Sequence, residues 1–149
     1  MTSDDTKLSF RIEQDETGYP PVTVESLHIS KISEERYCLE SIPFFFREAT
    51  LGDIVVVDEE DDGLSYALVV GGELNSLVRV FVPASEQVEA LTVLLDEMGL
   101  LFEVLKDFGV VAISISPEQS YRDVLARLEE SLDMETGGIE DVLCRHIFG

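Results

Sequence analysis

The rhythm of apolar residues changes in the middle of this 149-residue chain. Before Gly71-Gly72, short runs of alternating or β-branched apolar residues are separated by turn residues. After it, two stretches repeat apolar residues at helical spacing. Alternation indicates strands, and apolar residues three and four apart indicate helices. The chain is therefore predicted to be an α+β protein, in which a β-rich half (1–74) precedes a mixed half (75–149).

Five short strands are predicted in the first half. Leu8, Phe10 and Ile12 alternate with polar residues, and Asp62-Gly63 is a hairpin signal between two apolar runs. The expected strands cover 8–12, 22–30, 36–40, 54–57 and 65–70. In the strand at 22–30, Leu27 and Ile29 are expected on one face, opposite the face with Val22, Val24, Ser26, His28 and Ser30. Short strands joined by turns are typical of a small β-barrel-like subdomain.

The second half is predicted to be a ferredoxin-like β-α-β-β-α-β unit. Strands are expected over 76–82, 100–106, 110–116 and 139–147. The first helix is expected to begin with Ser85 as N-cap and to end at Gly99, and the second to begin near Pro117 and to end at Gly137-Gly138. The expected buried stripes are Val88, Leu91, Leu94, Leu95 and Met98 in the first helix, and Tyr121, Val124, Leu125 and Leu128 in the second.

The chain carries 31 acidic and 10 basic residues, a formal net charge of −21. Residues 1–74 have 17 acids and 5 bases, and residues 75–149 have 14 acids and 5 bases, so the charge is spread over both halves. Such a surface repels phosphate and anionic lipid, which argues against direct nucleic-acid or membrane binding, and it attracts basic proteins. Acidity that serves only solubility remains the alternative.

Two acidic clusters are the candidate partner-binding sites. The first is the turn Asp58, Glu59, Glu60, Asp61 and Asp62, and the second comprises Glu129, Glu130, Asp133 and Glu135. The first also resembles the opening of an EF-hand loop, but the twelfth position is Val69 where Ca²⁺ binding needs a bidentate Glu. A solvated hairpin turn is the better interpretation.

No catalytic constellation, metal site or cofactor is predicted. Cys144 and His146 stand two apart on the expected last strand, so their side chains would run parallel instead of meeting. His28 is the only other histidine, and no spacing suggests zinc. The three phenylalanines at 44–46 are either an exposed anchor for a partner or, as we favour, mostly core.

The predicted location is the cytoplasm. The chain has two cysteines, Cys38 and Cys144, without CxxC spacing, which suggests a reducing compartment. Residues 1–7 show no apolar segment of a signal peptide, and no apolar run approaches the ~20 residues that span a bilayer.

Several segments together resemble an uncharacterised family of small bacterial proteins, a domain of unknown function. They are Gln14-Asp15-Glu16, Gly18-Tyr19-Pro20-Pro21, Glu25-Ser26-Leu27, Ile42-Pro43-Phe44-Phe45 and Leu51-Gly52-Asp53. The resemblance runs from Phe10 to Cys144, and His28 departs from it where an aromatic is expected. It implies a two-part unit of bacterial cytoplasmic origin and transfers no catalytic residue.

Two functions fit these observations. The leading hypothesis is an immunity protein or inhibitor that neutralises a basic toxin such as a nuclease, because a nuclease must attract phosphate. The alternative is a small-molecule-sensing or regulatory module with a ligand pocket between the two halves, lined by residues 44–46, Tyr66 and Tyr121. The oligomeric state is left open.

Overall fold

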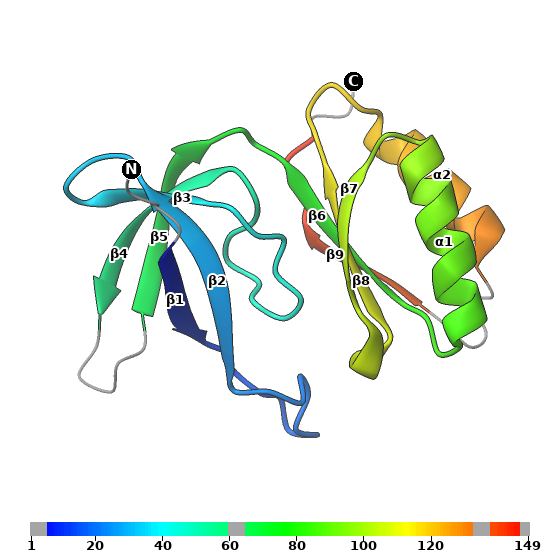
Figure 1. Cartoon of the computed structure of the whole chain (residues 1–149), viewed down its shortest axis with the longest axis horizontal. Coiled ribbons are helices and arrows are strands. Elements are labelled where there is room, and N and C mark those ends of the chain that lie inside the picture. The colour runs from blue at the N-terminus through cyan, green and yellow to red at the C-terminus, as the bar shows by residue number, and fades with distance from the viewer. Residues whose placement is uncertain (1–5, 60–64, 133–137, 147–149) are drawn as a thin grey trace. The chain divides into compact units, whose positions relative to one another are not determined.

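A computed structural model describes residues 6–59, 65–132 and 138–146. The chain divides into two compact units, Met1–Leu74 and Asn75–Gly149. Among the described residues, the first unit contains strands and no α-helix, and the second combines a sheet with two helices (Figure 1). The predicted α+β class is confirmed.

The first unit contains five strands: β1 (Thr6–Arg11), β2 (Val24–Lys31), β3 (Arg36–Leu39), β4 (Asp53–Glu59) and β5 (Ser65–Gly72). Each strand pairs in antiparallel fashion with the next, in the order β1-β2-β3-β4-β5. A single parallel pair, Phe10 with Ser65, joins β5 to β1. Six residue pairs join β1 to β2, whereas one pair joins β1 to β5, so the contact between the first and last strands is much shorter than that between the first two.

The alternating residues of these strands divide between an inner and an outer side. The inner side chains form the core: Phe10, Leu27, Ile29, Leu39 and Val55 are all nearly or fully buried. Because successive side chains point to opposite sides of a strand, the residues between them point outward. The predicted face formed by Leu27 and Ile29 is therefore confirmed.

Gly72 lies at a point where two backbone segments nearly touch. A Cβ atom at this position would stand 2.5 Å from the carbonyl oxygen of Gly52, and the Gly72 φ is +133°. Only glycine meets both conditions without moving the backbone. Glycine at position 72 therefore allows the end of β5 to pair closely with the start of β4.

The second unit contains β6 (Ser76–Phe81), α1 (Ser85–Glu97), β7 (Leu101–Leu105), the short 3₁₀ helix η1 (Lys106–Phe108), β8 (Val110–Ile115), α2 (Tyr121–Ser131) and β9 (Gly138–Leu143). Its antiparallel sheet has the order β7-β8-β6-β9. The predicted β-α-β-β-α-β order is confirmed. Figure 1 shows both helices on one side of this sheet.

The helices bury the stripes that their spacing predicted. Val88, Leu91 and Leu95 of α1 and Tyr121, Val124 and Leu128 of α2 are buried, and all belong to the core formed with β6 and β8. The remaining stripe residues, Leu94, Met98 and Leu125, are only partly buried at the margin of that core.

Three predicted boundaries were wrong. The N-cap of α1 is Ala84 instead of Ser85, and no side chain caps it. The second helix begins at Tyr121 instead of near Pro117, because Ser120 accepts a hydrogen bond from the Asp123 N–H and so provides the cap. The last strand ends at Leu143, so Cys144 and His146 follow it. The expected stop at Gly137 lies outside the described residues.

Candidate functional site

The two predicted acidic clusters belong to different units. Asp58 is exposed near the end of β4, and Glu59 is the last residue of that strand. Glu129 and Glu130 are exposed at the end of α2. The other cluster residues, Glu60, Asp61, Asp62, Asp133 and Glu135, lie outside the described residues. Strands β4 and β5 flank the first cluster, as expected for a hairpin.

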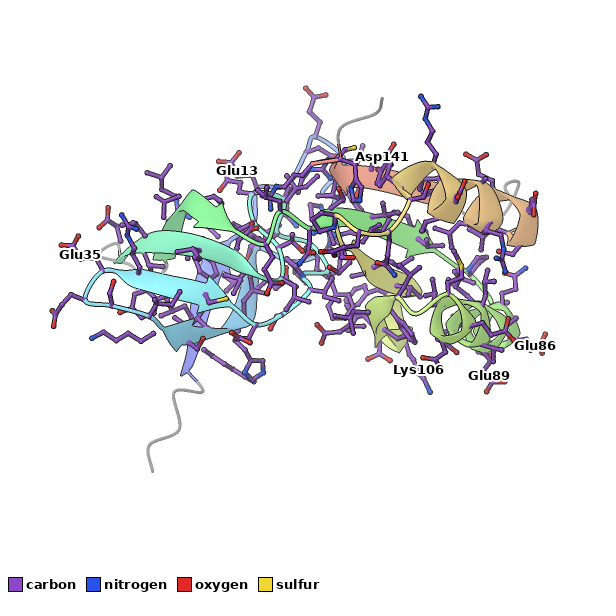
Figure 2. All side chains as sticks on the ribbon, turned by 90° about the horizontal axis from the view of Figure 1, so that it is seen from above. Glu13, Glu35, Glu86, Glu89, Lys106 and Asp141 are labelled. Atoms are coloured by element: carbon purple, nitrogen blue, oxygen red, sulfur yellow. The ribbon has the colours of Figure 1, made fainter. Side chains whose placement is uncertain are left out.

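Helix α1 carries carboxylates that the sequence clusters did not include. Glu86, Glu89, Asp96 and Glu97 are exposed, and Ser85–Glu97 contains no basic residue. Figure 2 shows Glu86 and Glu89 projecting outward from the helix. Asp96 and Glu97 lie in the last turn, where the helix dipole disfavours negative charge. This helix therefore keeps acidic charge at a cost to its own stability.

A second surface feature is apolar. On the outer side of β4 and β5, Leu68 and Val70 remain 57% and 43% exposed, and Ile54 and Val56 beside them are half-buried. Val56 pairs directly with Leu68 in the strand register. We call these four residues the outer apolar face. The sequence did not reveal it, because both sides of these strands are apolar.

Glu25, a residue of β2, binds the backbone of the phenylalanine segment, residues 44–46. Its carboxylate accepts hydrogen bonds from the backbone N–H groups of residues 44, 45 and 46, at 2.7, 2.9 and 2.7 Å. A carboxylate that accepts three N–H bonds satisfies donors that an irregular segment leaves without strand partners. Glu25 therefore ties residues 41–50 to β2.

The phenylalanine segment is mostly core. Phe45 and Phe46 are each 5% exposed, and the Phe46 ring packs on Phe10 with 5.0 Å between ring centroids. Phe44 is half-buried. The interpretation of this segment as core is thus confirmed for two of its three aromatic residues.

His146 has a structural network of its own. Its Nε2 lies 2.8 Å from the Ser116 carbonyl oxygen, and its Nδ1 lies 2.7 Å from the hydroxyl of Ser76. A carbonyl oxygen can only accept, so Nε2 carries a hydrogen and donates it to Ser116. Ser76 is fully buried and also accepts from the Arg145 N–H. A buried hydroxyl used in this way fastens the segment after β9 to β6.

Tyr121 completes this network. Its ring stacks on His146, with centroids 5.3 Å apart, and its hydroxyl donates to the carboxylate of Asp141. Burial, followed by the hydrogen bond to Asp141 and its charge, raises the pKa of Tyr121 above its ordinary value. The phenol therefore stays protonated and acts as a donor that holds α2 against β9.

The two free cysteines differ in environment, which gives a test of the structure. Burial, and then the neighbouring Glu40 charge, raises the pKa of Cys38 to about 11, whereas Cys144 is exposed. At pH 8 the reactive thiolate of Cys38 is roughly a hundredfold rarer than that of an ordinary thiol. We expect one fast and one slow thiol in alkylation followed by mass spectrometry. Cys144→Ser should remove the fast phase and Cys38→Ala the slow one, and equal rates would contradict this assignment.

Two observations on the described residues concern metal and ligand binding. Within residues 6–59, 65–132 and 138–146, no three His, Cys, Asp or Glu side chains group together as metal ligands. A hollow lined by Gln87, Ala90, Leu91, Ser131 and Leu132 has a volume of about 80 Å³. Pockets for small molecules are typically ~300–1,000 Å³. None of the described helices is long and apolar enough to cross a membrane.

Comparisons with known proteins extend these observations. Residues 25–140 match the family model described as a domain of unknown function, DUF4265. A solved structure, described as a hypothetical protein from Neisseria gonorrhoeae, has a TM-score of 0.71 with this chain at 14% sequence identity. The match covers 99% of this chain and 100% of that one, so the two share a fold. No curated protein matches the chain.

Proposed function

Since the chain belongs to the DUF4265 family, whose function is unknown, we propose its function from its own surface. It is an acidic cytoplasmic binding protein, an immunity protein or inhibitor that neutralises a basic toxin such as a nuclease. The observation that carries the proposal is the exposed charge of α1, with four carboxylates and no base. Two of these carboxylates oppose the helix dipole, so local stability does not explain them.

The mechanism is electrostatic capture. A nuclease needs a positive surface to hold phosphates, and a negative protein surface is attracted to the same field. With a net charge of −21, the chain accelerates encounter with such a partner and covers the surface that nucleic acid would use. Association should therefore weaken as salt rises.

Recovery of a partner tests this function. The chain is used as bait in its host at ~50 and ~200 mM salt, and bound proteins are identified. We expect a basic protein that is retained better at the lower salt. The purified partner should possess an activity, such as nucleic-acid cleavage, that one equivalent of the chain abolishes. Recovery of no basic protein at either salt would overturn the proposal.

Charge-reversal variants test which of the two predicted acidic clusters contacts the partner. Asp58→Lys with Glu59→Lys, and Glu129→Lys with Glu130→Lys, change the net charge equally. Both pairs should leave folding intact, because they relieve like-charge repulsion. The pair at the contacted cluster should lower the association rate roughly tenfold and reduce its salt dependence, measured by stopped-flow mixing with the purified partner. If neither pair changes the rate, the acidic clusters do not steer binding.

The small-molecule alternative stays a prediction with a direct measurement. Thermal-shift screening against metabolites would promote it if one ligand class raised the melting temperature reproducibly, since a ligand that binds only the native state stabilises it.

A further inference from the structure

The outer apolar face is unusual for a chain with this much charge. Leu68 and Val70 are exposed side by side on β5, and Val56 and Ile54 of β4 lie next to them. A contiguous apolar patch rimmed by polar residues is typical of a protein-protein interaction site. Strand pairing sets Val56 directly beside Leu68, and Val70 lies at the irregularity between the pairs Val55–Val69 and Ile54–Gly71.

The strand register continues this patch over β3. Arg36 pairs with Val56, and Cys38 pairs with Ile54. Beyond Arg36 lies Ile32, which is 53% exposed and whose N–H donates to the Arg36 carbonyl. A row of neighbouring residues, one on each successive strand, therefore runs from Ile32 through Arg36 and Val56 to Leu68. The stem of an exposed arginine can itself cover apolar surface, so Arg36 does not interrupt the row.

Several carboxylates lie at the margin of the patch, on the side of β3 and at the end of β4. Asp58 is exposed further along β4, and Glu34 and Glu35 are exposed in the turn before β3. Figure 2 shows Glu35 projecting away from that turn. On the side of β2, Glu40 is exposed and its carboxylate accepts a hydrogen bond from Ser30 at 2.9 Å. The surface thus combines an apolar centre with an acidic margin.

We propose that the outer apolar face is the docking surface for a basic protein partner, an inference that rests on the proposed function and names the surface that performs it. The partner must present an apolar patch bordered by Lys and Arg, because the centre of an interface supplies affinity and its charged rim supplies steering. A second copy of this chain does not fit. In a two-fold contact the same patch faces itself, which sets Asp58, Glu35 and Glu40 against like charges.

Site-specific crosslinking in host cells locates the contact. A photoreactive phenylalanine analogue replaces Leu68 in one variant and Leu101 in another. Leu101 is a matched control, because it is also an exposed leucine on a strand, at 63% exposure. We expect position 68, and not position 101, to crosslink to a basic protein that mass spectrometry identifies.

Affinity measurements with that purified protein follow. The test variant carries Leu68→Ser and Val70→Ser, and the control carries Leu101→Ser and Val24→Ser, which removes the same two exposed side-chain types outside the proposed docking surface and outside α1. The test variant should bind at least roughly tenfold more weakly, mainly through faster dissociation, whereas the control should stay within about twofold. Equal melting temperatures of the two variants establish that folding is not the cause.

Each outcome decides a separate point. If the basic partner crosslinks at position 101 but not at 68, or if the control variant weakens binding as much, the docking surface is wrong and the proposed function stands. If a basic partner is neither crosslinked nor recovered at low salt, the proposed function itself fails. A crosslink from position 68 to a second copy of this chain, or to an acidic protein, also overturns the inference.

Discussion

Replacing Leu128 by alanine is expected to lower the free energy of unfolding by about 2–5 kcal/mol. The Leu128 side chain is 0% exposed, within the core that both helices form with β6 and β8. Truncation removes buried methyl groups and leaves a cavity that the rigid sheet cannot fill. Urea unfolding followed by circular dichroism measures the loss, and hydrogen exchange of the second unit assigns it to that core.

Leu125→Ala is the matched control on the same helix. Leu125 is only partly buried at the margin of the core, so less of its side chain leaves water on folding. Its loss should be less than half of that for Leu128. Equal losses at the two positions, or a loss below ~1 kcal/mol at Leu128, would contradict the helix orientation.

The second large effect is expected for Glu25→Ala. Three backbone donors, at residues 44–46, would lose their common acceptor. A buried donor left without a partner costs ~1–3 kcal/mol, and these are part-buried, so the total should be about 2–4 kcal/mol. Urea unfolding measures the total, and hydrogen exchange should show faster exchange of these three amides.

Glu25→Gln separates the hydrogen bonds from the charge. The glutamine side chain has a similar size, but only one of its terminal atoms accepts and the charge is lost. Stability should fall between the wild type and Glu25→Ala. If the alanine variant is as stable as wild type, the contact does not stabilise the segment.

The fold was largely predictable because its signals are local. Alternation marked Leu27 and Ile29 as inward-facing, and three- and four-residue spacing marked Leu91 and Leu95. The predicted first residues of the two helices were wrong because several local signals competed. Ser85 and Pro117 each suit a helix start, yet Ser120, followed three residues later by Asp123, provides the only side-chain cap of the two described α-helices.

The site features were not predictable because they join distant residues. Glu25 and Phe44 are 19 positions apart, and Ser76 and His146 are 70 positions apart. No local pattern connects such pairs before the strands have paired. The outer apolar face could not be predicted for another reason. Val69 and Val70 look alike in the sequence, and only the fold decides which one faces water.

The hydrogen bonds of Glu25 also bear on how the family varies. The Glu25-Ser26-Leu27 and Ile42-Pro43-Phe44-Phe45 segments stand apart in the sequence, yet one carboxylate supports the backbone of the second. A relative that loses the acid must satisfy those amides in another way, for instance through a rebuilt loop. Substitutions in the two segments should therefore be correlated among members of the family. Sequences that retain the aromatic segment but carry an apolar residue at the position of Glu25 should be rare, and each should show a compensating acceptor.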